Sequence, residues 1–181
     1  MTNLKISVLT RTDWKIYKQL RLLSLQDSPD SFGSTYAREV EYSNEEWISR
    51  LDSYERAKYS LPLIAKLNGV AIGLAWGLRH NCEDQTAHVY QMWVSPMARG
   101  QNVGKLLLNK IILWASRNNL QAIVLAVTTT NQAAVSLYQS AGFKFIGEPE
   151  VLREFSPLMV QKMKLDLCRE ITKKPLNRDI E

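Results

Sequence analysis

The chain has 181 residues and a net charge of +5, and a single domain with a full hydrophobic core is expected at this length. Hydrophobic residues make up 45% and charged residues 23% of it, as in ordinary soluble globular proteins. The sequence contains no apolar run of about 18 residues, no signal-peptide pattern, no disulfide framework and no metal-ligand spacing. We therefore expect a cytoplasmic protein with no metal, no membrane partner and, because no basic helix face is interleaved with aromatic residues, no nucleic-acid partner.

Capping residues and a break define two helices in the first third of the chain. Thr12 or Asp13 is placed to cap a strongly apolar first helix, which the turn-forming segment 27–30 ends. Ser43 and Glu46 have the spacing of a capping box at the start of a second helix. The expected elements are a strand over 4–9, a first helix up to the break, a polar and aromatic segment over 31–39 and a second helix over 44–52.

Strand signals dominate the middle of the chain. Asn68 and Gly69 form a strong two-residue turn signal between two apolar stretches, which predicts a β-hairpin. The continuous apolar run 122–127 is rich enough in β-branched residues to predict a buried strand. The expected elements are strands over 61–67, 70–78, 87–94 and 122–127, with a helix that ends near 118 before the last of them.

A helix and two closing strands are expected in the last part of the chain. Asn131 is placed to cap the helix, and Gly142 stands where a C-terminal glycine belongs. Strands are expected over 143–147 and 157–167, followed by a frayed tail. The predicted order is β-α-α-β-β-β-α-β-α-β-β, which indicates an α/β (α+β) fold with a single domain over 1–168 and a tail over 169–181.

A strand, a short basic turn and a helix follow one another at the centre of the chain. The first N–H groups of a helix have no partner inside it, and the helix dipole adds positive charge there, so such a junction binds anions. Arg99 and Lys105 add full charges at the two ends of the turn. Leu106 stands where a P-loop needs a hydroxyl, and Gly100 and Gly104 alone do not complete a dinucleotide fingerprint. The turn therefore predicts a phosphate or pyrophosphate ligand of another kind.

The turn resembles the acetyl-CoA loop of the GNAT acetyltransferase superfamily, Arg/Gln-x-x-Gly-x-Gly/Ala. In this chain it reads Arg99-Gly100-Gln101-Asn102-Val103-Gly104. Asn102 replaces the first motif glycine, and because Asn tolerates left-handed backbone angles best after Gly, we expect the loop to keep its shape. Residues 131–143, NQAAVSLYQSAGF, are similar to the second family signature, Asn-x-x-Ala…Tyr-x-x-x-Gly-Phe.

The resemblance implies a mixed, splayed central sheet flanked by helices, in which strands 87–94 and 122–127 diverge to admit the cofactor. It implies acetyl-CoA as co-substrate, with the pantetheine arm on the backbone of Met92, Trp93 and Val94. A backbone N–H of Met92 or Trp93 is expected to polarise the thioester oxygen. The expected cofactor-binding residues are Met92, Trp93, Val94, Arg99, Gly100, Gln101, Asn102, Val103, Gly104, Lys105, Asn131 and Tyr138.

Acetyl transfer to an amine needs a base that keeps the amine neutral and an acid that protonates the leaving thiolate. Tyr138 occupies the family position of the acid, and a phenol has a pKa near that of a thiol, about 10. For the base, His88, Glu39, Glu41 and water remain alternatives, because the strand 87–94 carries no carboxylate. The two glutamates follow the segment that lines the acceptor pocket in the family, so either could instead bind a cationic amine.

The sequence thus predicts an N-acetyltransferase that moves the acetyl group from acetyl-CoA directly to a primary amine, with a small molecule as the preferred acceptor. A protein N-terminus or lysine is the alternative acceptor. A non-catalytic acyl-CoA-binding sensor is the alternative from another class, favoured by Asn102 and disfavoured by Tyr138, since binding alone needs no acid. The family resemblance also allows a homodimer.

Overall fold

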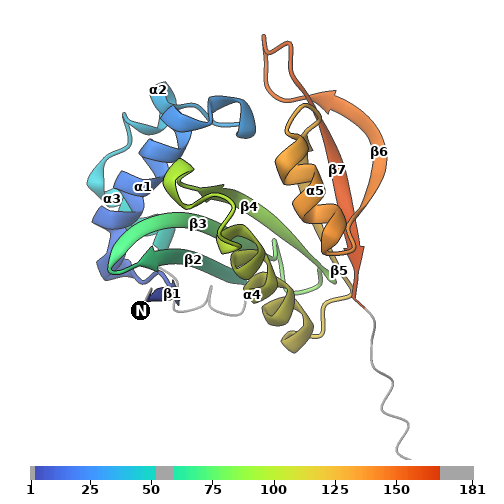
Figure 1. The fold of residues 1–181 in the computed structure, drawn as a ribbon, viewed down its shortest axis with the longest axis horizontal. Helices are drawn as coiled ribbons and strands as arrows, with labels where there is room; N and C mark the ends of the chain where they lie inside the picture. The colour runs from blue at the N-terminus through green and yellow to red at the C-terminus, as the bar shows by residue number, and fades with distance from the viewer. Residues whose placement is uncertain (1–2, 52–58, 168–181) are drawn as a thin grey trace, which may run out of the picture.

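The computed structural model describes residues 3–51 and 59–167 as one seven-stranded mixed sheet with helices on both faces (Figure 1). The strands are β1 (Leu4–Val8), β2 (Ser60–Leu67), β3 (Val70–Leu78), β4 (Thr86–Val94), β5 (Ala122–Thr128), β6 (Lys144–Val151) and β7 (Met159–Asp166). The helices are α1 (Trp14–Asp27), α2 (Tyr36–Glu39), α3 (Asn44–Leu51), α4 (Val103–Arg117) and α5 (Gln132–Ser140), with short 3-10 turns that include η2 (Pro29–Ser31) and η4 (Pro96–Ala98). The predicted α/β (α+β) fold and element order are confirmed, whereas the predicted tail over 169–181 lies outside the described residues.

The sheet opens between its fourth and fifth strands. The strand order is β1-β2-β3-β4-β5-β7-β6, and every pair of neighbours is antiparallel except β4 and β5, which are parallel. These two strands pair only where residues 86–88 of β4 lie beside 122–124 of β5. Beyond that point they diverge (Figure 1), so within the described residues the edge of β4 that faces β5 has no strand partner over 89–94. The predicted splay is confirmed.

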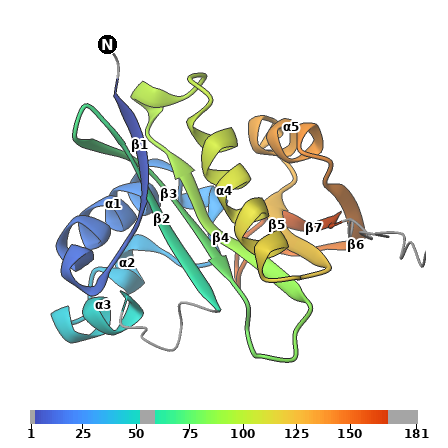
Figure 2. The same cartoon turned by 90° about the horizontal axis from the view of Figure 1, so that it is seen from below.

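Helices cover both faces of the sheet (Figure 2), and each face carries its own hydrophobic core. On one face α4 packs on β2, β3 and β4 and buries Leu107, Leu108 and Ile111 completely. On the other face α1 and α3 bring Tyr17 and Trp47 together with ring centroids 5.5 Å apart. Fully burying side chains of this size stabilises a fold by roughly 1.5–3 kcal/mol each, so each face holds its own helices firmly against the strands.

Local turn chemistry decides where several elements begin. Asn68 and Gly69 both take positive φ, 50° and 85°, which confirms the predicted two-residue hairpin. The Ser43 hydroxyl accepts from the Glu46 N–H at 3.2 Å, and the Glu46 carboxylate accepts from the Ser43 N–H at 2.7 Å, which confirms the capping box.

Two details of the predicted elements differ in the structure. Asp13 is the N-cap residue of α1, as one of the two predicted alternatives, but its side chain makes no capping hydrogen bond to this helix, because its carboxylate accepts from the Thr10 N–H at 2.8 Å and from the Thr10 hydroxyl at 2.7 Å in the turn before the helix. The strand predicted to end at Gly147 continues to 151. Gly147 takes a φ of +64°, and the pairing with β7 shifts register there, so a glycine bulge lets β6 resume beyond it.

Residues 3–51 and 59–167 contain no helix that is both long and apolar enough to cross a membrane. They also contain no group of three or more His, Cys, Asp or Glu side chains arranged to hold a metal ion.

Candidate active site

The turn between β4 and α4 has the backbone of an anion-binding loop. Gly100 and Asn102 take left-handed φ angles of 76° and 62°, so the expected tolerance of Asn102 for this conformation is confirmed. Within the described residues, the backbone N–H groups of 100–105 donate to no acceptor. These donors surround the N-terminus of the 15-residue helix α4, where the helix dipole adds positive charge. The loop therefore presents a set of free N–H donors to an anionic ligand.

At Gly104, the position of a Cβ atom faces a packing contact and not the open side of the loop. A Cβ atom at this position would lie 3.2 Å from Leu137 Cδ2 and 3.7 Å from Val94 Cγ2. The first turn of α4 thus approaches α5 so closely that a larger residue would push the two helices apart. The glycine sets the position of the N–H donors relative to α5.

Arg99 is directed to the C-terminal end of α1. Its Nε donates to the Val94 carbonyl at 3.0 Å, and its Nη2 donates to Asp27 Oδ2 and, at 3.3 Å, to the Ser28 hydroxyl. Trp93 Nε1 donates to the same oxygen of Asp27 at 2.8 Å. Burial tends to raise the pKa of Asp27, but the hydrogen bonds of Ser28 and Trp93 and the charge of Arg99 outweigh it and lower the pKa. Asp27, which the sequence did not single out, therefore joins α1 to the end of β4 and the start of the loop.

The register of β4 decides which backbone groups face the open edge. The Ser95 N–H donates to the Ile72 carbonyl of β3 at 2.8 Å, and Trp93 lies opposite Leu74 two residues earlier. Hydrogen-bonded and non-bonded pairs alternate in an antiparallel ladder, so Trp93 also turns its N–H towards β3. The N–H of Met92 then faces the open edge. Of the two residues predicted to polarise a thioester oxygen, the register favours Met92.

A β-bulge separates the two halves of β4. Gln91 takes a φ of +53°, and the pairing with β3 shifts register between Leu74 and Trp76. The Tyr17 hydroxyl of α1 donates to Gln91 Oε1 at 3.1 Å. Tyr90 lies opposite Trp76, whose ring meets Tyr17 edge-on with centroids 5.5 Å apart. The side chains just before the bulge therefore lie on the α1 face of the sheet.

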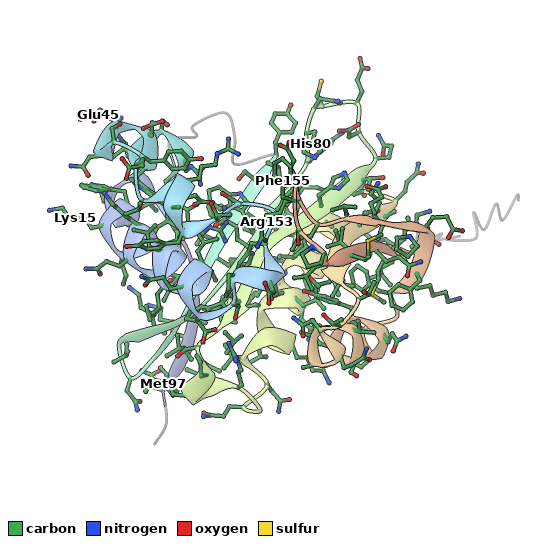
Figure 3. All side chains as sticks on the ribbon, turned by 90° about the horizontal axis from the view of Figure 1, so that it is seen from above. Lys15, Glu45, His80, Met97, Arg153 and Phe155 are labelled. Atoms are coloured by element: carbon green, nitrogen blue, oxygen red, sulfur yellow. The ribbon has the colours of Figure 1, made fainter. Side chains whose placement is uncertain are left out.

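His88 lies on this face, at the last position where β4 pairs with β5. Its ring is 4.7 Å from that of His80, centroid to centroid, and His80 Nε2 is 3.1 Å from the Tyr90 hydroxyl (His80 is labelled in Figure 3). Burial lowers the pKa of His88, and the charge of His80 lowers it further. The imidazole is therefore neutral near pH 7, as a base must be. The sequence-based prediction missed His80, although it is the other histidine of the chain and lies within the short connection between β3 and β4.

Tyr138 lies on the opposite face, in the core that α4 and α5 share. Its side chain is 6% exposed, and its ring centroid is 6.0 Å from that of Phe143. Burial raises the pKa of this phenol, which therefore keeps its proton. Asn131 caps α5, as predicted, because its Oδ1 accepts from the Ala134 N–H at 3.1 Å.

Glu39 is buried in an ion pair. Its side chain is 2% exposed, and its two oxygens accept from Arg21 Nη2 at 2.7 Å and Nε at 3.1 Å. Arg50 Nη1 adds a third contact at 3.4 Å. Burial tends to raise the pKa of Glu39, but the hydrogen bonds and charge of Arg21 outweigh it and lower the pKa. This arrangement favours a structural role for Glu39 over that of a base or a cation ligand, whereas Glu41 is exposed.

The sequence did contain a signal for this pair. Arg21 is a charged residue on the face of α1 that also carries Tyr17 and Leu25, each four positions away. A charge on a buried helix face needs a partner, and Glu39 is the acidic residue of the short helix that follows.

Comparison with known proteins agrees with this geometry. Residues 21–143 match the family described as the acetyltransferase (GNAT) family, and this range includes the open loop and Tyr138. The chain belongs to the GNAT acetyltransferase family. The GNAT match leaves out β1, the first half of α1 and the closing strands β6 and β7.

Individual GNAT relatives are distant. N-acetylaspartate synthetase of Xenopus tropicalis is 31% identical over 121 residues, which are 64% of this chain and 44% of the relative. The chain spans less than half the length of the curated relatives that it matches first.

Solved structures agree with the GNAT fold. A GNAT-family acetyltransferase from Streptococcus pneumoniae superposes with a TM-score of 0.76 at 23% identity, covering 91% of this chain and 100% of the other. Spermidine N-acetyltransferase from Vibrio cholerae, solved in complex with CoA and spermine, superposes with a TM-score of 0.73 at 20% identity, covering 90% and 95%.

Proposed function

We propose that the chain is an N-acetyltransferase that moves the acetyl group of acetyl-CoA directly to a primary amine on a small molecule. The observation that carries this proposal is the open edge of β4, which runs into the free N–H donors of the α4 loop. An amide-bearing arm adds readily to an open strand edge, and a pyrophosphate binds at a helix N-terminus. The pantetheine arm and the pyrophosphate of acetyl-CoA follow each other in the same order as these two features.

The roles of the side chains follow from the two faces of the sheet. The Met92 N–H is available to polarise the thioester oxygen at the open edge. His88, on the α1 face, accepts a proton from the amine, directly or through a water molecule. Tyr138, on the α4 face, donates its proton to the leaving sulfur. Bound acetyl-CoA supplies the activated acetyl group, and base and acid approach it from opposite sides of the sheet.

The names of two similar proteins, N-acetylaspartate synthetase and spermidine N-acetyltransferase, support a small-molecule acceptor. An assay of free-thiol release from acetyl-CoA, run over a panel of small amines and amine-bearing peptides, tests the proposal. We expect turnover with a small amine. Turnover with peptides alone would favour a protein acceptor, and binding of acetyl-CoA without turnover on any acceptor would favour the non-catalytic sensor.

The pH dependence tests His88. Its pKa is lower than that of an ordinary histidine, about 6.5, and its protonated form cannot accept a proton. We expect kcat/KM to be flat around neutral pH and to fall about tenfold per pH unit below the pKa of His88. His80→Gln removes a neighbouring positive charge, so it should move this fall to higher pH. A profile that His88→Gln leaves unchanged would remove His88 as the base.

Substitution of Asn102 tests the loop. Asn102→Gly keeps the left-handed φ of 62° accessible, so we expect acetyl-CoA affinity to be retained or increased. Asn102→Val should weaken binding by roughly 5- to 30-fold, because a left-handed conformation costs an ordinary residue about 1–2 kcal/mol. Calorimetric titration of both variants with acetyl-CoA measures this difference, and a clear loss for Asn102→Gly would show that the Asn side chain itself contacts the ligand.

A further inference from the structure

Two arginines meet one carboxylate among the first three helices, and a third arginine from the loop between β6 and β7 reaches the same region through Phe32. Glu39 accepts from Arg21 at 2.7 Å and from Arg50 at 3.4 Å. Arg153, from the β6–β7 loop, donates to the Phe32 carbonyl at 2.9 Å, and Figure 3 shows it beside the segment around η2. The Arg21 guanidinium lies 4.6 Å over the centroid of the Phe32 ring, so Phe32 connects the two halves of the cluster. The cluster of Arg21, Arg50, Arg153 and Glu39 thus carries a net positive charge.

The cluster has more donors than Glu39 can use. The Arg21 side chain is 4% exposed, and its Nη1 is buried with no hydrogen-bond partner in the described part of the chain. Buried polar groups are almost always paired, so this guanidinium nitrogen is a donor that Glu39 leaves unused. Arg50 is 30% exposed and is held over the rings of Tyr42 and Trp47, at 4.6 and 5.3 Å from their centroids. Among the described residues its ion-pair partner is Glu39, at 3.4 Å, and the Tyr17 hydroxyl also interacts with its guanidinium.

The cluster is linked to the strand at which acetyl transfer is proposed. The Trp47 ring that supports Arg50 packs edge-on against Tyr17, and Tyr17 donates to Gln91 at 3.1 Å. Gln91 is the bulge residue immediately before Met92. An anion bound by the arginines therefore lies on the α1 face of the sheet, which is also the face of His88.

We propose that the acceptor amine carries a carboxylate, as an amino acid does, and that the arginine cluster binds this carboxylate. The inference rests on the proposed acetyl transfer and specifies its substrate class. A carboxylate is the planar anion that guanidinium groups bind best, through paired charge-assisted hydrogen bonds. A polyamine would instead bring positive charge next to three arginines, and the carboxylate of the cluster is already bound by two of them.

A series of amines that lose one carboxylate at a time tests the proposal. L-aspartate has two carboxylates, β-alanine has one and ethylamine has none, and spermidine is a polycation. Initial rates of thiol release with each of them give four values of kcat/KM to compare. We expect β-alanine to exceed ethylamine by roughly 10- to 100-fold, as for a hydrogen-bonded charge pair shielded from water. Spermidine should do no better than ethylamine.

Arg50→Gln is the variant of choice, because it leaves the buried pair of Arg21 and Glu39 intact. It should bring the ratio of β-alanine to ethylamine close to one, and Arg153→Gln provides a second variant if Arg50→Gln does not fold. Arg117→Gln, at the exposed C-terminal end of α4, removes the same charge elsewhere and should keep the ratio of the unmodified protein.

A parallel titration with acetyl-CoA separates the two possible failures. If acetyl-CoA binds and ethylamine or spermidine is the better acceptor, the inference is overturned and the proposed acetyltransferase stands. The inference is likewise overturned if acetyl-CoA binds and an amine without a carboxylate is acetylated, while L-aspartate, β-alanine and all other amino acids are not acetylated. If acetyl-CoA does not bind, the proposed function itself fails and the inference fails with it.

Discussion

Replacing Glu39 by alanine should lower the free energy of unfolding by about 3–5 kcal/mol, because the buried Arg21 guanidinium then loses its counter-ion. Both side chains are nearly inaccessible, at 2% and 4% exposed, and two hydrogen bonds join them. Urea denaturation of the purified variant measures the loss. Glu41→Ala makes the same change at an exposed position two residues away, and a surface substitution of this kind should change stability by no more than about 0.5 kcal/mol.

The contribution of Glu39 should also depend on pH. Because its folded-state pKa is lowered, the stabilisation is fully present above the pKa of an unfolded glutamate, about 4.3. It is lost as the pH falls through the lower pKa of the folded state. The difference between the unmodified protein and Glu39→Ala should therefore shrink on acidification. Equal unfolding midpoints for Glu39→Ala and Glu41→Ala at neutral pH would contradict this account of the pair.

Replacing Tyr138 by phenylalanine should lower turnover by on the order of 10²-fold with little change in acetyl-CoA affinity, as expected when a general acid is lost. The ring is buried in the core of α4 and α5, so phenylalanine retains its packing. Single-turnover thiol release and calorimetry with acetyl-CoA separate the two effects. Tyr59→Phe, which removes a hydroxyl from the residue before β2, should leave turnover unchanged.

The raised pKa of Tyr138 has a further consequence for the pH profile. Burial keeps the phenol protonated throughout the range of an ordinary assay, so its ionisation should not limit the rate on the alkaline side. The acid limb, assigned to His88, should then be the main feature of the profile. Unchanged turnover in Tyr138→Phe would remove the assignment of Tyr138 as the acid.

Features that depend on neighbouring residues could be predicted from the sequence. The Asn68-Gly69 turn, the capping box of Ser43 and the left-handed Asn102 all follow from backbone preferences within a few residues. The splay between β4 and β5 was expected from the resemblance of two short motifs to a known family. The shape of the loop that we propose as the cofactor site could therefore be predicted before the structure was known.

Features that depend on side chains far apart in the chain could not be predicted. Asp27 and Arg99 are 72 positions apart, and nothing in the pattern around either residue specifies the other. Glu39 was considered as a base because it follows an aromatic segment, but the fold places Arg21 of the preceding helix against it. The position of Arg21 on the apolar face of α1 indicates that it needs a partner, but which carboxylate meets it there is decided by the packing of the core and not by the local sequence.

The most direct test of the central claim is a calorimetric titration of the unmodified chain with acetyl-CoA and, in parallel, with S-acetylpantetheine, which lacks the nucleotide and its pyrophosphate. If the open edge of β4 and the free N–H groups of 100–105 form one cofactor site, acetyl-CoA should bind with a stoichiometry of about one. The affinity for S-acetylpantetheine should then be on the order of 10²-fold lower, because this thioester cannot form the charge-assisted hydrogen bonds between the pyrophosphate and the loop. Equal affinity for the two thioesters, or no binding of acetyl-CoA, would contradict the assignment of this loop.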